Sequence, residues 1–429
     1  MDIPHNGRKH IGIVGAGIAG LHLGLRLRQF GMDCTIITDR SPEQVAAGQL
    51  TNTVVHWPAT LRRERVLQVY HWPTEEFGFR HFRHIIQGPE PIVIRSQSAA
   101  PARAVDYRIY LSRLMEDFAD RGGRLELAAL DVRDIDRLAD RFDLIVVATP
   151  GNGFAQLFVP NLEESPYDRP QRYWLAGLFV GFRSAADLSA TVSVAPGHSE
   201  ALAFPLLSRT GMGTALLINS LHRDELAMLR VLSSRPGRAG FCGALLRKLK
   251  QMHPAIHGQI DAARFDLQGP DDLAWAAVTP IVRASQVHLG GGKYAVALGD
   301  VHVTVDPALG QGANIGSYSA FALADAIAEA RSFDLEFCLE MERCRAARLL
   351  CASRWTNASL GAPDDARMEL MLAMSRDQRL ANEYIDNFDR PERQWDRTGS
   401  ADRIRAWVGE ARREMAFSAA SPERMSLVS

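Results

Sequence analysis

The stretch IGIVGAGIAGLHLGLRLRQFG, from Ile11 to Gly31, decides the fold of this 429-residue chain. Residues 10–15 form an almost wholly apolar run, which predicts a strand buried on both faces of a sheet. A helix is predicted at about residues 19–30, and the glycines between the two elements have Gly-x-Gly-x-x-Gly spacing. This spacing permits a tight turn, close approach of a pyrophosphate and close helix–strand packing, and the helix start supplies amide donors. We therefore predict a dinucleotide-binding Rossmann domain, with a first contact set of Gly15, Ala16, Gly17, Ile18, Ala19 and Gly20.

A carboxylate follows the second predicted strand, residues 34–38. Asp39 comes nineteen residues after Gly20, the spacing at which an acid accepts hydrogen bonds from an adenosine ribose. Thr38 is adjacent, and the sequence leaves open which of the two side chains faces the ribose. We also assign Arg40, and Thr149 in the predicted strand 142–151, to this part of the site.

A second glycine-rich stretch, GDVHVTVDPALGQGANIG, lies far along the chain at Gly299 to Gly316. Its Gly-Asp pair ends a predicted strand and offers a carboxylate to the hydroxyl groups of a ribityl chain. The turn that follows leads into a helix whose amides can meet the edge of a flavin, and its glycines leave room for a flat ring. An ordinary strand–turn–helix crossover is the alternative, but the combination with the first fingerprint favours FAD. This half of the predicted site comprises Gly299, Asp300, Pro307, Gly310, Gln311, Gly312, Ala313 and Asn314.

The bulk composition argues against several classes of function. Lysine and arginine total 49 against 50 aspartates and glutamates, so no attraction to nucleic acid or membrane is predicted. No apolar run approaches the roughly 20 residues of a bilayer span. The five cysteines form no Cys-x-x-Cys pair, which indicates reduced thiols in a cytoplasmic protein. Only one dinucleotide fingerprint is present, so we expect another protein to reduce the flavin.

The order of the predicted elements indicates an α/β fold with two interleaved domains. Residues 41–105 read as short strands and turns, and residues 165–285 as strands separated by turns, whereas residues after 312 are mostly helical. We predict a discontinuous FAD-binding domain from residues 1–50, 101–160 and 286–350. A substrate domain with an antiparallel sheet is expected from residues 51–100 and 161–285, followed by a helical region at 351–429.

The sequence also resembles the oxygenase component of two-component styrene and indole monooxygenases, a group of flavoprotein monooxygenases, over nearly its whole length. The matching motifs are IGIVGAGIAGLHLGLRLRQ (11–29), NTVVHW (52–57), WPTEEFGF (72–79), PARAVDYRIY (101–110), LGDVHVTVDPALGQGAN (298–314), LLCASRWTN (349–357) and NFDRPERQWDR (387–397). The last two of these are specific, because generic FAD enzymes lack them.

The resemblance implies a fold of the glutathione-reductase and p-hydroxybenzoate-hydroxylase type. It implies FAD bound in its reduced form, FADH2, which a separate NADH-dependent flavin reductase delivers. Such proteins form a C4a-hydroperoxyflavin with O2 and pass its distal oxygen to an aryl alkene, giving an epoxide; aryl sulfides are oxidised as well. Because the cofactor is the electrophile, the protein must mainly exclude water and hold the alkene. Self-association as a homodimer stays open.

Asn52, Val54 and His56 alternate, so a strand there would present all three side chains on one face. By resemblance, that face lines the space above the flavin, with Asn52 and His56 as candidate catalytic residues and Val54 as a substrate contact. The alternative is a strand whose polar groups are satisfied locally.

Three further positions match the substrate pocket of the family: Phe79, Phe82 and Ala102. Styrene-type members usually carry Tyr, His and Ser there, so these departures leave the native substrate open. Packing in the core is the alternative for both phenylalanines.

Arg103 can approach the phosphates or the ribityl chain of FAD, and a structural salt bridge is the equal alternative. No metal site is predicted, because His81 and His84 would point to opposite faces of a strand.

Four other functions remain as alternatives to styrene-type epoxidation. They are an indole monooxygenase of the same family, a single-component hydroxylase that reduces its own flavin with NAD(P)H, a flavin-dependent halogenase and a flavin-binding protein without catalysis. The halogenase is disfavoured, because the Trp-x-Trp-x-Ile-Pro segment is absent from the sequence.

Overall fold

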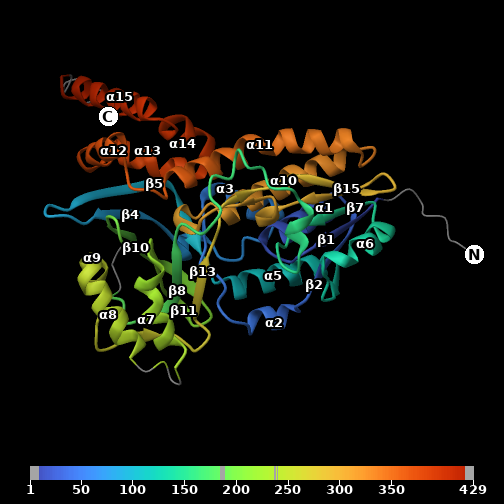
Figure 1. The fold of residues 1–429 in the computed structure, drawn as a ribbon, viewed down its shortest axis with the longest axis horizontal. Helices are drawn as coiled ribbons and strands as arrows, with labels where there is room; N and C mark the ends of the chain where they lie inside the picture. The colour runs from blue at the N-terminus through green and yellow to red at the C-terminus, as the bar shows by residue number, and fades with distance from the viewer. Residues whose placement is uncertain (1–8, 184–188, 236–237, 239, 421–429) are drawn as a thin grey trace, which may run out of the picture.

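The computed structural model describes residues 9–183, 189–235, 238 and 240–420; residues 1–8 and 421–429 of the predicted domains lie outside this part. Two large sheets organise the chain and lie toward opposite ends of its long axis in Figure 1. Helices pack on the faces of both sheets, which confirms the predicted α/β class.

The first sheet has six strands in the order β15-β16-β7-β1-β2-β6, and only β15 runs antiparallel to its neighbour. The central strand β1 alternates between two cores, because Ile11 and Ile13 pack on one face and Val14 on the other. A Cβ on Gly12 would lie 2.5 Å from the ring of Phe142, so the sheet leaves no room for a side chain there. The strands are β1 (His10–Val14), β2 (Asp33–Thr38), β6 (Arg124–Leu127), β7 (Leu144–Val147), β15 (Gln286–Gly290) and β16 (Lys293–Ala297).

Helices cover both faces of this sheet. One face carries α1 (Ile18–Gln29), α5 (Tyr107–Asp120), α10 (Gly312–Glu329) and the start of α11 (Leu335–Ala358). The opposite face is covered by α6 (Ile135–Arg141) and the 3-10 turn η2 (Phe154–Leu157).

The second sheet has nine strands, ordered β12-β8-β11-β10-β9-β4-β5-β3 with β13 also paired to β8. It is antiparallel as predicted, except that β4 runs parallel to β9. A short pair, β14 (Ile281–Val282) with β17 (Val303–Thr304), lies apart from both sheets. The strands are β3 (Val55–His56), β4 (Gly78–Ile86), β5 (Ile92–Ala104), β8 (Tyr173–Val180), β9 (Ser189–Ala195), β10 (Ser199–Ser208), β11 (Gly211–Ser220), β12 (Asp266–Leu267) and β13 (Leu273–Ala277).

This sheet is also packed on both faces. Helices α7 (Arg223–Ser233), α8 (Phe241–Met252) and α9 (Pro254–His257) cover one face. The other face meets α11 and the C-terminal helices, which lie above β4 and β5 in Figure 1. These are α12 (Asp365–Arg376), α13 (Gln378–Asp386), α14 (Pro391–Thr398) and α15 (Ala401–Ala420).

The expectation for residues 41–105 was wrong in detail. Instead of short strands and turns, this region holds α2 (Pro42–Ala46), α3 (Pro58–Leu67), α4 (Thr74–Phe77) and two long strands, β4 and β5. The buried face of α3 includes Thr60 and Glu64, and these polar residues break the apolar period that would reveal a helix. Strand β5 continues through the predicted domain boundary at 100/101, and the division into domains stays a prediction.

Within the described ranges, no helix combines the length and apolar character needed to cross a bilayer.

Candidate active site

The carboxyl ends of the parallel strands bring the predicted cofactor residues to one edge of the first sheet. Val14 of β1 is the register partner of both Ile37 and Val147, and Val147 pairs in turn with Ala297. The residues that follow these four positions therefore lie side by side. They include the fingerprint, Thr38 to Arg40, Thr149 and the Gly299-Asp300 pair.

The three fingerprint glycines have different physical reasons. Gly15 has a φ of +113°, which favours glycine, and a Cβ on Gly20 would lie 2.1 Å from the carbonyl oxygen of Gly15. A Cβ on Gly17, by contrast, would meet no protein atom within 4 Å. Gly17 therefore opens onto free space at the start of α1, which is the space that a pyrophosphate requires.

The end of β2 is accessible for a ribose. Asp39 forms an ion pair of 3.8 Å with Arg40, and the Asp39 side chain is 60% exposed. Thr38 is partly buried, and its carbonyl accepts a backbone hydrogen bond from Ala128. Both side chains are therefore candidates for the contact with the ribose.

The two remote glycine-rich stretches lie next to each other. A Cβ on Gly299 would lie 3.1 Å from the Cβ of Ala19, and Nδ1 of His22 lies 2.9 Å from Oγ of Ser317. Helices α1 and α10 are thus joined directly behind the fingerprint. The adjacency predicted from the sequence is present in the fold.

Asp300 lies in the 3-10 turn η4 (Gly299–Val301), which follows β16 and contacts α10. Its residue surface is exposed, and a Cβ on Gly312 would lie 3.8 Å from its Oδ1. Nevertheless, burial raises the pKa of the Asp300 carboxyl, and the charge of Arg283 only partly opposes this. An accessible carboxyl group beside the start of α10 is suited to the hydroxyl groups of a ribityl chain.

Two predicted cofactor residues are used internally through their side chains. Oδ1 of Asn314 accepts hydrogen bonds from the backbone N–H of Trp57 and the hydroxyl of Thr60, and Nδ2 donates to the carbonyls of Val55 and Gly310. The amide of Gln311 donates to the carbonyls of residues 309 and 388. Only the backbone here is free to serve a flavin, through the first amides of α10.

The expected strand at Asn52–His56 is wrong, because only Val55 and His56 are in strand conformation. Asn52 is exposed in the preceding loop, and Val54 packs against the core of the first sheet. His56 is buried and does not line the apolar cavity that lies against the second sheet. The odd-numbered residues of the segment line it instead: Thr53, Val55 and Trp57.

His56 belongs to a buried polar network centred on Glu64. Its Nδ1 lies 2.8 Å from Oε1 of Glu64, and its Nε2 lies 2.9 Å from the hydroxyl of Tyr107. The hydroxyl of Tyr110 donates to Glu64 at 3.1 Å and contacts Nε2 of His22 at 2.9 Å. The network therefore connects β3, α3 and α5 with the helix of the fingerprint.

This network controls the charge of its members. Burial alone would raise the pKa of Glu64, but hydrogen bonds and charge from His56 and Arg103 lower it to about 2. Burial lowers the pKa of His56, although Glu64 opposes this. Burial raises the pKa of Tyr107 well above its ordinary value, and the charges of Glu64 and Asp300 add to this. The charge of Asp300 thus acts on the hydroxyl group of Tyr107.

The prediction that Arg103 contacts FAD is not supported by its position. Its guanidinium is completely buried and donates to Oε2 of Glu64 at 2.5 Å and to the carbonyl of Trp72 at 2.6 Å. The equal alternative, a structural salt bridge, describes it. Arg108 is similar, because it pairs with Asp106 and Asp272.

An apolar cavity of about 550 Å³ lies between the second sheet and the C-terminal helices. Phe79 and Phe82 line it as predicted, and they are also part of the core around it. Ala102 does not line it, because it is fully buried and pairs with Phe79 in the β4–β5 ladder. The turn Pro307–Gly310 forms one wall, and a Cβ on Gly310 would lie 4.0 Å from Nε1 of Trp57. The turn thus belongs both to the second glycine-rich stretch and to the wall of the cavity.

The sequence comparisons agree with this geometry. Residues 151–258 match the family described as "Styrene monooxygenase A putative substrate binding domain". Styrene monooxygenase StyA from a Pseudomonas species and from Pseudomonas fluorescens are each 40% identical over 407 residues, covering 94% of this chain and 98% of each relative. The chain belongs to the styrene monooxygenase family. It is therefore an FAD-dependent monooxygenase, and the expected resemblance is confirmed.

Solved structures place this styrene monooxygenase family member in a wider fold group. The flavin-dependent brominase Bmp2 is 14% identical with a TM-score of 0.65, over 94% of this chain and all of its own. The myxobacterial chondrochloren halogenase CndH is 17% identical with a TM-score of 0.60, over 94% and 96% of the two chains. Klebsiella pneumoniae HpxO complexed with FAD is 16% identical with a TM-score of 0.56, over 93% and 99%. At these identities the likeness shows the fold alone.

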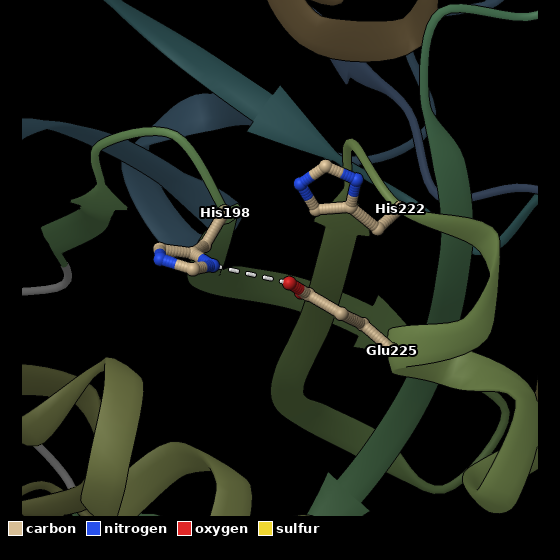
Figure 2. A group of neighbouring side chains, drawn as sticks. All are labelled: His198, His222 and Glu225. Carbon is tan, nitrogen blue, oxygen red and sulfur yellow. Dashed lines mark hydrogen bonds and ion pairs between the residues drawn. The ribbon is translucent and has the colours of Figure 1, made fainter.

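One side-chain group has the composition of a metal site, which the sequence analysis did not consider. His198, His222 and Glu225 gather where β10 begins and β11 ends, as Figure 2 shows. Nδ1 of His198 lies 3.2 Å from Glu225, whose other oxygen accepts from Ser220 at 2.7 Å and lies 3.4 Å from Nζ of Lys248. The lysine already neutralises this carboxylate, so an ion-paired surface cluster explains the group.

The sequence analysis of this styrene monooxygenase family member missed three residues of the site. Glu64 was hidden in a helix that was not predicted, and Tyr107 and Tyr110 lie within a motif whose phenols were not singled out. The two tyrosines are three residues apart, a spacing that places both on one face of a helix, and this was the available signal.

Proposed function

We propose that the chain is the oxygenase component of a two-component system and epoxidises styrene-like aryl alkenes, and that aryl sulfides are also substrates. One oxygen atom of O2 goes to the two alkene carbons and the other leaves as water. The two electrons come from NADH through a separate reductase, which delivers them as FADH2. Reduced FAD supplies the activation of O2, and the protein supplies binding, orientation and exclusion of water.

The observation that carries the proposal is that the second glycine-rich stretch touches both the fingerprint and the apolar cavity. Gly299 lies against Ala19 at the start of α1, and the turn Pro307–Gly310 lines the cavity beside Trp57. A dinucleotide with its phosphates at α1 would reach the cavity with its ring system. The alkene would then lie against Val55, Phe79 and Phe82, where no water competes for the reactive oxygen.

Roles follow for the remaining site residues. Thr38 or Asp39 would bind the ribose, Thr149 would support the turn at Gly15, and Asp300 would bind the ribityl hydroxyls. The first amides of α10, at Gly312 and Ala313, would meet the flavin edge.

We assign two different roles to the residues first taken as catalytic. Asn52, whose side chain is accessible, is proposed to hydrogen-bond at the reacting edge of the flavin. His56 is proposed as a positioning residue, because Glu64 holds its imidazole and it in turn holds the hydroxyl of Tyr107. Cytoplasmic placement belongs to the proposal, and the five free cysteines support a reducing compartment.

The test is turnover with purified components: the chain, FAD, NADH, an NADH-dependent flavin reductase, air and styrene. We expect styrene oxide in proportion to the NADH consumed, measured by chiral gas chromatography. Omitting the chain should leave only hydrogen peroxide. FAD binding without any epoxide would contradict the proposal.

Two controls separate the alternatives. The curated relatives are styrene monooxygenases, so indole should be converted more slowly than styrene under the same reductase. NADH alone should not bleach the flavin; rapid bleaching without a reductase would indicate a single-component hydroxylase.

The cofactor position has its own prediction. Gly17→Val should lower FAD affinity at least tenfold, measured by fluorescence titration, because its side chain would fill the space for the pyrophosphate. Gly361→Val is the matched control, since Gly361 also faces open space but lies at the cavity mouth. Equal affinities in both variants would mean that the phosphates bind elsewhere.

A further inference from the structure

The apolar cavity extends far beyond the flavin turn. Phe79 and Phe82 line its inner end, and His84 and Ile86 line it further along the same strand, β4. At roughly 3.3 Å per residue, the path from Phe79 to Ile86 is about 23 Å long. A cavity of about 550 Å³ also falls in the range of roughly 300–1,000 Å³ that holds drug-sized ligands. Styrene, with eight carbon atoms, would occupy only the inner end.

The outer half of the cavity is lined mainly by aliphatic side chains, and Gln87, Glu90 and Arg367 also belong to the lining. The aliphatic side chains come from β4, β5 and the C-terminal helices, which close over this face of the second sheet in Figure 1. The aliphatic part of the outer lining comprises Ile86, Ile92, Ile94, Val194, Leu370, Met371, Met374 and Ile404. Flexible methionines among branched residues adapt to an apolar chain rather than to one rigid ring.

The charged groups midway along the wall, at Glu200 on β10, are paired with each other. Arg172 and Glu200 lie 2.6 Å apart, and Glu200 also accepts a hydrogen bond from Asn219 at 3.1 Å. Burial lowers the pKa of His84 to about 4, so its imidazole is neutral at physiological pH. A ligand that runs past this point therefore gains nothing from carrying an ion.

We propose that the preferred substrates are aryl alkenes that carry an extended apolar substituent on the ring, on the side opposite the alkene. The aryl alkene would lie at Trp57, Phe79 and Phe82, and the substituent would run along β4 toward Ile86 and Met371. This inference rests on the proposed epoxidation and adds the substrate class to it.

The experiment compares styrene with 4-hexylstyrene in the reconstituted system with FAD and reductase. Each buried methylene raises affinity by about fourfold at most, so kcat/KM should be at least tenfold higher for 4-hexylstyrene. Met371→Trp should remove this advantage by filling the outer cavity, and leave styrene turnover within twofold. Leu372→Trp is the matched control, because Leu372 is the next residue, 39% exposed and outside the lining.

Each outcome has a defined meaning. Equal kcat/KM for the two alkenes in the wild type would overturn the inference but leave the proposed function intact. A loss in Met371→Trp that is equal for both alkenes would make the outer half an entry route rather than a binding site. If no alkene is epoxidised, the proposed function fails, and calorimetric binding of 4-hexylstyrene to the FAD complex of wild type and Met371→Trp still decides whether the outer cavity binds it.

Discussion

Two buried carboxyl groups, Glu64 on α3 and Asp306 at the start of the turn Pro307–Gly310, differ in how their charge is compensated. Both are completely buried, yet the pKa of Glu64 is lowered to about 2 and that of Asp306 is raised to about 6. Glu64 accepts hydrogen bonds from Arg103 and Tyr110 and pairs with His56. Asp306 accepts one from the backbone N–H of Ala308, and the side chain of Trp174 and the charge of Arg172 offset the effect of burial on its pKa only in part. Pairing, rather than burial, thus decides the charge of a buried acid.

The contrast has a functional consequence. The hydrogen bonds of Glu64 join α3 to β3, β5 and α5, so this part of the molecule is held rigidly. Asp306 directly precedes the turn Pro307–Gly310, which lines the cavity, and its charge is only partly compensated. The network around Glu64 can hold the side chains bonded to it in position, whereas the apolar lining of the cavity can be substituted to accept different substrates.

The largest effect is expected on the paired side. Glu64→Gln should lower the free energy of unfolding by about 3–5 kcal/mol, because it leaves the buried guanidinium of Arg103 without its counter-ion. Urea denaturation monitored by circular dichroism measures this. The double variant Glu64→Gln, Arg103→Met should recover part of the loss, since neither charge is then left alone. Additive losses would show that the two groups act independently.

Asp306 should behave in the opposite way. Because its pKa is raised from 3.8 to about 6, the native state binds this proton more tightly than the unfolded chain does, and ionisation costs stability as pH rises from about 4 to 6. From pH 4 to pH 7, the stability of Asp306→Asn relative to wild type should therefore improve by about 2 kcal/mol. Thermal unfolding of both proteins across this range tests it. A constant difference between them would mean that Asp306 titrates normally.

A smaller effect should distinguish the two faces of residues 53–57. Val55→Leu places a methylene in the cavity and should change kcat/KM for styrene by roughly tenfold, the usual discrimination for one methylene. Val54→Leu places it in the core of the first sheet and should leave kcat/KM within twofold while lowering stability by about 1–3 kcal/mol. Steady-state kinetics and melting curves measure both. The reverse pattern would restore the even-numbered residues as the substrate face.

The comparison also explains what the sequence could and could not predict. The fingerprint glycines, Asp39 and Asp300 follow directly from local spacing, because strand ends determine where they lie. The roles of His56, Ala102 and Arg103 depend on which face of a strand meets which layer, and residues 53–57 turn their odd-numbered side chains to the cavity. Glu64 was missed since a buried carboxylate on a helix reads as a solvent-exposed position. The chemistry that depends on local spacing was thus predictable from the sequence, whereas the choice of which side chains of a strand face the cavity was not.

The contact between Ala19 and Gly299 has a consequence for synthesis in the cell. About 280 residues separate the two halves of the nucleotide cleft, so a ribosome adding roughly 5–20 residues per second needs about 15–60 s between them. During that interval the nascent chain holds a phosphate loop with no partner, and β7 awaits its neighbour β16 with an open apolar edge. Cofactor capture must therefore be late, and fragments that end before residue 300 should aggregate rather than bind flavin.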